Sequence, residues 1–217
     1  MNIKFEKKPC LSLMPSMTLL ETKGVFLKMN VSHLPVVQEG LFVGALSLDM
    51  IEGLNETSLL ENYISHLEPI YVKEATHWME VFQVMQQHSC NYIAVLNDLG
   101  AVVQTYHLKD VLEQLHNTPF VNEKGDVIVI TANVTDFSLS KITQIIEAHQ
   151  GTVLGMLVEN QNPSSTQIFM KLQTDDFNNT CLSLRRYGYN VLTSQTEKHS
   201  HSEFEAQIDY LKKYIFI

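Results

Sequence analysis

Two short segments of the sequence place hydroxyl, carboxylate and imidazole side chains where an apolar run gives way to a helical segment. Ser47 and Asp49 follow the first apolar run, and His107 and Asp110 follow the second. A carboxylate has enough lone pairs to accept hydrogen bonds from two neighbouring hydroxyl groups, and a hydroxyl at a helix N-terminus suits an anion. A protonated His107 could bridge a phosphate. These residue types could therefore hold a polar ligand at the end of a strand.

Each of these residues also has a purely structural interpretation. Ser47 could be a helix cap, and Asp110 could stabilise the N-terminal end of a helix dipole by roughly a few tenths of a kcal/mol. His107 could be a packed histidine, because no nucleophile or paired carboxylate lies near it in sequence. The motifs of serine hydrolases, P-loop proteins, zinc proteases and dinucleotide-binding turns are missing from the sequence. We therefore expect a protein that is not an enzyme.

A second set of polar side chains alternates near the C-terminus, at His199, His201, Glu203 and Glu205. Alternation suits a strand, whereas this stretch leads into a segment with apolar residues at helical spacing. These apolar residues are Phe204, Ile208, Leu211 and Tyr214. We interpret the four polar residues as part of a solvated tail and expect no metal site there.

Composition and charge exclude several classes of protein. The chain has 217 residues, of which 45% are hydrophobic and 18% charged, as is typical of a globular protein. Its net charge is −9 and its first arginine is Arg185, so it has no positive surface for a nucleic acid. Cys10, Cys90 and Cys181 form no CxxC pair, which favours a reducing compartment. With no 18-residue apolar run and no secretory pattern, we expect a cytoplasmic protein that does not bind membranes.

The polar residues are attached to a hairpin that occurs twice. Residues 31–47 read as an apolar strand, a turn at Gly40 and a second apolar strand. Residues 91–106 repeat this pattern about sixty residues later, with Gly100 in the turn. One such hairpin with its helices cannot cover both faces of its small sheet. We therefore expect the two copies to pack together, each covering the other.

Helical segments flank both hairpins at matching positions. Upstream, residues 19–29 correspond to residues 78–88, and downstream, residues 49–54 correspond to residues 109–114. The apolar stripe that contains Trp78 is expected to be core or dimer interface.

The pattern changes after a polar segment, residues 121–126, which we expect to be a linker. The elements predicted beyond it are a strand over 127–133, a helix over 139–149, strands over 153–158 and 167–172, a helix over 175–187 and a strand over 190–193. This βαββαβ order is that of the ferredoxin-like fold. The predicted fold class is α/β (α+β). Its predicted parts are a repeat pair over 1–120 (about 1–58 and 59–120), a βαββαβ domain over 126–196 and a helical tail over 197–217.

Residues 31–54 resemble the signature of a CBS domain. The resemblance lies in Leu-Pro-Val-Val at 34–37, Gly40, and Gly-Ala-Leu-Ser-Leu-Asp-Met at 44–50. Residues 91–115 resemble a second copy. Residues 126–196 are similar to the ACT-like module that follows CBS pairs in proteins of the acetoin-utilisation AcuB type. The order CBS–CBS–ACT-like is more specific than any of its parts.

The resemblance implies a Bateman module, in which clefts between two CBS repeats often accept adenosine nucleotides or S-adenosylmethionine. In such clefts an Asp accepts hydrogen bonds from both ribose hydroxyls, and a Ser or Thr three residues earlier donates to phosphate or ribose. Each repeat here keeps half of that pair. Ser47 lacks its Asp, because Met50 takes that position and Asp49 would point about 100° away around a helix. Asp110 lacks its Ser or Thr, because His107 takes that position.

Two functions follow from the resemblance. The first is a non-catalytic regulatory protein that binds an adenosine nucleotide or S-adenosylmethionine, with the cleft at Asp110 favoured over the one at Ser47. It would be a homodimer through its CBS repeats and would act on an unidentified protein target. The second is a degenerate oligomerisation scaffold without a small-molecule ligand. Residues 136–139 lack the glycine that amino-acid-binding ACT domains carry, so the sequence does not support a ligand there.

Overall fold

The computed structural model describes residues 10–161 and 164–193. The chain divides into two compact units, residues 1–115 and residues 116–217. Across the described residues, no helix combines the length and the apolar character needed to cross a membrane.

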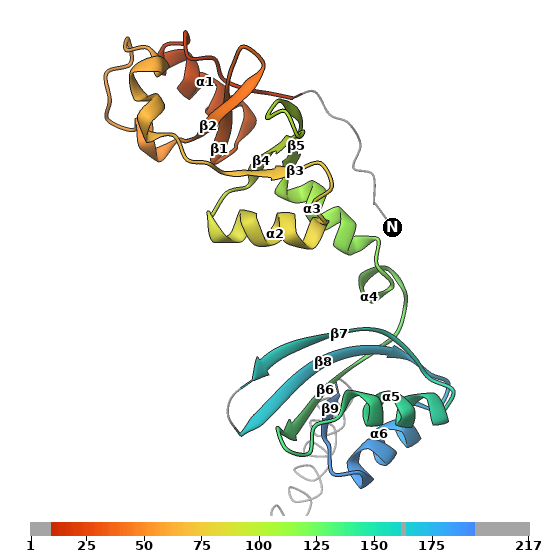
Figure 1. Ribbon diagram of the computed structural model, residues 1–217. Helices are drawn as coiled ribbons and strands as arrows, with labels where there is room; N and C mark the ends of the chain where they lie inside the picture. Colours follow the sequence, from red (N-terminus) through yellow and green to blue (C-terminus); the bar gives the residue numbers. More distant parts are fainter. Residues whose placement is uncertain (1–9, 162–163, 194–217) are drawn as a thin grey trace, which may run out of the picture. The chain divides into compact units, whose positions relative to one another are not determined.

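The first unit contains two small sheets with their helices (Figure 1). Its elements are α1 (Leu19–Met29), β1 (His33–Gln38), β2 (Leu41–Ser47), η1 (Asp49–Ile51), η2 (Leu60–His66), β3 (Tyr71–Lys73), α2 (Trp78–Gln87), β4 (Tyr92–Leu96), β5 (Val102–His107) and α3 (Leu108–His116). Strands β1 and β2 form an antiparallel hairpin. Strands β4 and β5 form another, to which β3 adds in parallel.

The upstream helices begin and end for local reasons. Thr18 and Glu21 form a capping box at the start of α1, where the Glu21 carboxylate accepts a hydrogen bond of 2.8 Å from the Thr18 N–H. After α1 the chain passes through Asn30 in the left-handed region (φ 53°), and after α2 it passes through Ser89 at φ 51°. These two left-handed residues are 59 positions apart, so the two helices lead into their hairpins in the same way.

The two hairpins share their register as well as their order. A β-bulge interrupts the first between Val36 and Val37 and the second between Val95 and Leu96, again 59 positions apart. Both turns contain a glycine at positive φ, Gly40 and Gly100, in a conformation that side chains disfavour. The two hairpins of the predicted repeat therefore have the same bulge and the same glycine turn.

Contacts between the repeats are reciprocal, as a twofold relation requires. The Ser32 N–H donates to Asn91 Oδ1 at 2.8 Å, and the Asn91 N–H donates back to Ser32 Oγ at 3.0 Å. Leu41 forms a β-bridge with Ala101, its own counterpart in the second repeat. Tyr92 of the second repeat packs into the core of the first. The prediction of two pseudo-symmetric repeats packed as one domain is confirmed.

The repeats differ after their second strand. The sequence predicted matching helices over 49–54 and 109–114, and for the first repeat this is wrong. There the chain forms only η1, a 3₁₀ turn over Asp49–Ile51. Gly53 then adopts φ 76°, which helical backbone does not allow, and the chain leaves the turn. In the second repeat α3 continues to His116 because Val111 and Gln114 bury one of its faces.

The second unit is a four-stranded antiparallel sheet with two helices on one face (Figure 1). Its elements are α4 (Pro119–Asn122), β6 (Asp126–Asn133), α5 (Leu139–Ala148), β7 (Thr152–Gln161), β8 (Ser165–Gln173), α6 (Phe177–Arg186) and β9 (Asn190–Thr193). The strand order is β7-β8-β6-β9, so the predicted ferredoxin-like βαββαβ arrangement is confirmed. The short helix α4, within and before the expected linker, was not predicted.

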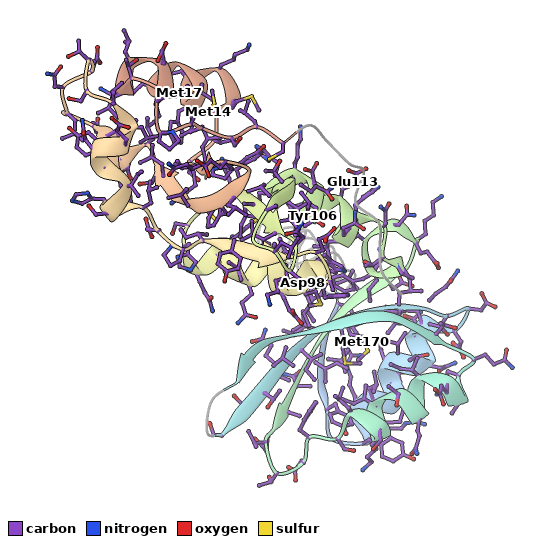
Figure 2. All side chains as sticks on the ribbon, turned by 45° about the horizontal axis from the view of Figure 1, so that its top comes forward. Met14, Met17, Asp98, Tyr106, Glu113 and Met170 are labelled. Atoms are coloured by element: carbon purple, nitrogen blue, oxygen red, sulfur yellow. The ribbon has the colours of Figure 1, made fainter. Side chains whose placement is uncertain are left out.

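Alternation along the strands explains the layers of the second unit. Every second residue of β8 is buried, from Thr166 to Leu172, and packs beneath α5 and α6. Met170, labelled in Figure 2, belongs to this fully buried set. The predicted tail helix over 197–217, with the alternating polar residues at 199–205, lies outside the described residues.

Candidate functional site

The second repeat turns from strand to helix without a loop, because β5 ends at His107 and α3 begins at Leu108. In the first turn of α3, Asp110 is only 8% exposed, and its Oδ2 accepts a hydrogen bond of 3.0 Å from the His107 N–H. His107 Nδ1 accepts a hydrogen bond of 3.2 Å from the Lys109 N–H. A carboxylate is thus held, largely out of water, at the positive end of a helix.

Aromatic and hydroxyl groups surround this turn. The Tyr92 and His107 rings meet edge to face with their centroids 6.3 Å apart. The Tyr92 hydroxyl and Thr105 Oγ1 are hydrogen-bonded at 2.6 Å. Burial raises the pKa of the Tyr92 phenol, and the negative charge of Asp110 adds to the rise, while the bond to Thr105 opposes it. The phenol is therefore neutral near neutral pH and offers a hydroxyl, not a charge.

The corresponding turn of the first repeat is built differently. Ser47 ends β2 opposite His33, and Asp49 begins η1 in an exposed position. Met50 stands where the second repeat has Asp110, and its side chain packs against the core of the first repeat. The first repeat thus has methionine packing where the second has a buried carboxylate.

His33 takes the place in the first hairpin that Tyr92 has in the second. It is 8% exposed, and its Nδ1 lies 2.9 Å from Ser32 Oγ. Burial lowers the pKa of His33, and the carboxylates of Glu68 and Asp49 oppose this, while the His88 charge lowers it further. The imidazole is therefore neutral near neutral pH.

The four residues predicted from the sequence accordingly form two pairs, one at each strand-to-helix turn. Ser47 and Asp49 belong to the first turn, and His107 and Asp110 to the second. Of these, Asp110 is the buried carboxylate, whereas Asp49 is exposed.

Two surface hollows lie elsewhere. One of about 550 Å³ lies beside α1 and is lined by Met14, Ser16, Met17, Glu21, Gly24, Val25 and Lys28 (Figure 2 labels Met14 and Met17). The other, of about 320 Å³, lies between α5 and α6, where His149 Nε2 and Ser183 Oγ are 2.8 Å apart. Neither hollow contains a predicted site residue. Within residues 10–161 and 164–193, no three His, Cys, Asp or Glu side chains gather as a metal site would require.

Comparison with known families identifies the repeats. Residues 4–51 and again residues 61–117 match the CBS domain family. These two matches fall on the two hairpins that repeat at 59 positions. The chain contains two CBS domains in tandem. Comparison with curated protein sequences finds no match.

Solved structures of CBS proteins are similar to about half of this chain. The cytosolic domain of the Mg²⁺ channel MgtE in complex with ATP is 22% identical over 48% of this chain and 44% of that one, with a TM-score of 0.40. A CBS domain pair/ACT domain protein from Thermotoga maritima is 22% identical over 49% and 90%, with a TM-score of 0.44. The CBS domains of a transcriptional regulator from Streptococcus pneumoniae are 17% identical over 49% and 92%, with a TM-score of 0.43.

This chain therefore aligns with less than half of the MgtE chain. Because all three TM-scores lie below 0.5, the assignment of the CBS pair rests on the family match and on the repeat within the chain.

Three residues of the CBS pair were missed by reasoning from sequence: His33, Tyr92 and Thr105. A signal for two of them was present. Counting outward from the turn glycines, Gly40 and Gly100, brings His33 opposite Ser47 and Tyr92 opposite His107, as the observed register does. The hydrogen bond between Tyr92 and Thr105 had no comparable signal in the sequence, because it depends on the orientation of two side chains on neighbouring strands.

Proposed function

We propose that the CBS pair is a non-catalytic sensor that binds an adenosine-containing ligand at the strand-to-helix turn of the second repeat. In this proposal Asp110 accepts hydrogen bonds from the two ribose hydroxyls, and His107 and Tyr92 flank the ligand with aromatic surface. Ser47 and Asp49 belong to a weaker second site in the first repeat. No catalytic family matches the chain, and the proposed role needs no chemistry beyond binding.

The observation that carries the proposal is the burial of Asp110. Capping a helix does not require burial, because Glu21 caps α1 through Thr18 from an exposed position. At Glu21 the hydrogen bond from the Thr18 backbone lowers the pKa of the carboxyl, as a cap should. Asp110 also bonds the backbone N–H of its turn, yet is 8% exposed. A buried carboxylate at the positive end of a helix suits the two hydroxyls of a ribose, because a carboxylate can accept a hydrogen bond from each.

The charges near the turn indicate which part of a nucleotide would matter. The sequence has no arginine before Arg185, so this repeat offers no bidentate fork for a phosphate. Lys109, next to Asp110, is exposed. We therefore expect affinity to come from the ribose and the base more than from the phosphates.

Titration of the full chain with AMP, ADP, ATP and S-adenosylmethionine tests the proposal by calorimetry and thermal shift. We expect at least one of them to bind with one dominant site per chain, and ATP to bind within about tenfold of AMP. Asp110→Asn should weaken binding at least tenfold, because the amide cannot accept from two hydroxyls as a carboxylate does. Asp49→Asn is the matched control in the first repeat and should leave the dominant site unchanged.

Two results would contradict the proposal. One is the lack of any response to the four ligands, and the other is equal weakening by Asp49→Asn and Asp110→Asn. A bound ligand would act as a signal only if it binds one arrangement of the two repeats better than another. A change in the arrangement of the repeats would alter the reciprocal hydrogen bonds between Ser32 and Asn91, which join the two repeats.

The alternative is an oligomerisation scaffold that has lost its ligand. Met50 supports it, because this side chain fills the position of the ligand carboxylate with core packing. A scaffold would keep its oligomeric state in the absence of any ligand and would show no binding in the titration above.

We further propose that the protein is a homodimer through its CBS helices. Apolar side chains are exposed at equivalent positions of α1 and α2, Leu20 and Met79, each 58% exposed, and Leu27 on α1 is 77% exposed. Leu20→Asp should shift a dimer toward monomer in sedimentation velocity. Leu99→Asp, in the exposed turn of the second hairpin, should not. A dimer that resists Leu20→Asp would place the interface elsewhere.

The remaining parts of the proposal concern the rest of the chain. We propose that residues 1–120 act as the CBS pair and that residues 126–196 are an ACT-like domain of the AcuB type. In this proposal the ACT-like domain passes the state of the CBS pair to a protein target. The βαββαβ order and the strand order of the second unit support the ACT-like assignment. The free cysteines, two of them buried, support a reducing, cytoplasmic environment.

A further inference from the structure

The hollow of about 320 Å³ between α5 and α6 brings together a cation, an imidazole and a hydroxyl group. The two helices lie side by side on one face of the sheet (Figure 1). Helix α5 contributes Lys141, the residue that follows it contributes the imidazole of His149, and α6 contributes Ser183. The residues that line the hollow include no carboxylate, although the chain has a net charge of −9. The hollow therefore suits an anion.

One end of the hollow has a hydroxyl that an imidazole supports. His149 Nε2 and Ser183 Oγ are 2.8 Å apart, and both residues are half-buried. When Nε2 carries a proton, it donates to the serine oxygen, and the serine hydroxyl can then donate to an anion. The backbone of His149 is held as well, because its carbonyl accepts a hydrogen bond of 3.1 Å from Thr174 Oγ1. The imidazole and the hydroxyl thus form a fixed donor pair.

The other end of the hollow has a positive charge. The Lys141 ammonium lies over the Tyr187 ring, 4.9 Å from its centroid, and this contact holds a long exposed side chain against α6. Tyr187 directly follows α6 and comes four positions after Ser183, so the two ends are about one helical turn, or about 5.4 Å, apart along that helix. Ile145 and Ala148 add apolar surface to the lining. The hollow therefore has two polar ends and an apolar part.

We propose that this hollow binds a small dicarboxylate, with one carboxylate at Lys141 and the other at the Ser183 hydroxyl. A carboxylate forms charge-assisted hydrogen bonds with both an ammonium and a hydroxyl. A few methylene groups between the carboxylates cover the distance between the two ends and contact Ile145 and Ala148. The volume lies at the lower end of the range of about 300–1,000 Å³ that is typical of ligand sites, which suits a small ligand.

The proposed site is independent of the CBS pair. All of its lining residues belong to the second unit. The proposal therefore does not depend on whether the CBS pair binds a nucleotide.

Titration of the isotope-labelled full chain with glutarate, followed by the NMR shifts of its amides without added nucleotide, tests this proposal. At constant ionic strength we expect saturable shifts at residues 144–149 and 183–187, with a midpoint of about 1 mM. Butyrate, which has one carboxylate, should bind more weakly by about fivefold or more. Lys141→Gln and Ser183→Ala should each weaken glutarate binding by about the same factor, whereas Lys141→Arg keeps the charge and should stay within about threefold of the wild type.

Lys124→Gln is the matched control, because it removes the same charge from an exposed position of the second unit outside the hollow. It should leave the midpoint for glutarate unchanged. In all variants the amide shifts of the sheet around Ile168 should match the wild type, which separates the loss of the site from a loss of folding.

Three results would overturn the proposal. The first is the lack of saturable shifts with glutarate, and the second is equal affinity for glutarate and butyrate. The third is equal weakening by Lys141→Gln and Lys124→Gln, because the dianion would then respond only to the net charge of the protein.

Discussion

The two CBS repeats are alike where the chain turns back on itself and unlike where a strand passes into a helix. Both have a left-handed residue after the first helix, a glycine turn and a bulge at equivalent positions. After the second strand, the first repeat forms one 3₁₀ turn with Met50 packed on its core, whereas the second forms α3 with Asp110 held at its N-terminus.

This difference shows that scaffold and site are specified separately. The turn, the bulge and the register fix which residues face the shared core, and a slip of one residue would reverse that pattern. The strand-to-helix turn lies beyond this constraint. It can therefore carry a carboxylate in one repeat and a methionine in the other without disturbing the pair.

The largest effect on stability is expected from a substitution at Gly44, whose counterpart in the second repeat is Gln104. A Cβ on Gly44 would lie 2.5 Å from the Leu67 Cβ, an atom too close to the backbone to move aside. Gly44→Ala should destabilise the first unit by about 1–3 kcal/mol. Denaturation followed by the fluorescence of Trp78, the one tryptophan of the sequence, measures this. Gly24→Ala, where a Cβ meets nothing within 4 Å, should instead stabilise α1 by about 0.5–1 kcal/mol.

A somewhat smaller effect is expected from removing the carboxylate that distinguishes the second repeat. Asp110→Ala deprives the His107 N–H of its 3.0 Å partner and should cost about 1–2 kcal/mol in the same denaturation experiment. Asp49→Ala, at an exposed position of the first repeat, should stay within about 0.5 kcal/mol of the wild type. Equal losses at the two positions would mean that the repeats do not differ here in the way described.

The contact between the repeats should give an effect that neither repeat shows alone. In a double-mutant cycle of Ser32→Ala and Asn91→Ala, we expect a coupling energy of about 0.5–1.5 kcal/mol, because each residue donates to the other. Additive losses within about 0.3 kcal/mol would contradict the reciprocal bonding. Trp78 fluorescence during urea denaturation again reports the result.

The smallest effect concerns the dependence of stability on pH. It arises because the first hairpin has His33 at the position where the second has Tyr92. Burial holds the pKa of His33 below its usual value, so the unfolded chain binds a proton at a higher pH than the folded one. The resulting stability is complete above the unfolded pKa of about 6.5 and declines as the pH falls toward the folded pKa. His33→Gln should therefore flatten the loss of stability between about pH 7 and pH 5. The exposed His66→Gln should keep the wild-type slope.

Particular residues show how much of the fold could be predicted from the sequence. Gly40 and Gly100 with their flanking apolar runs predicted both hairpins. The changes of period after residue 126 predicted the strands and the two longer helices that the structure describes in the second unit. The helix over 49–54 was wrong, because the match to 109–114 gave no weight to the backbone freedom of Gly53. The helix α4 was missed because four residues carry too little periodicity to be recognised.

For the candidate site, the sequence identified Asp110 and His107 but not their surroundings. It could not distinguish a buried carboxylate from an exposed one, and that distinction now separates Asp110 from Asp49. Burial depends on segments that are distant in the sequence. Tyr92 of β4 lies near enough for the charge of Asp110 to raise the pKa of its phenol.

By itself, the sequence determined the repeat, the turns and the order of the strands, because apolar alternation and glycine conformation act over a few neighbouring residues. Only the tertiary structure decided that Met50 joins a core, that Asp110 is withdrawn from water and that Phe120 covers Gly155. Those outcomes depend on which distant segments meet in the folded chain, and close packing allows each such position only one occupant.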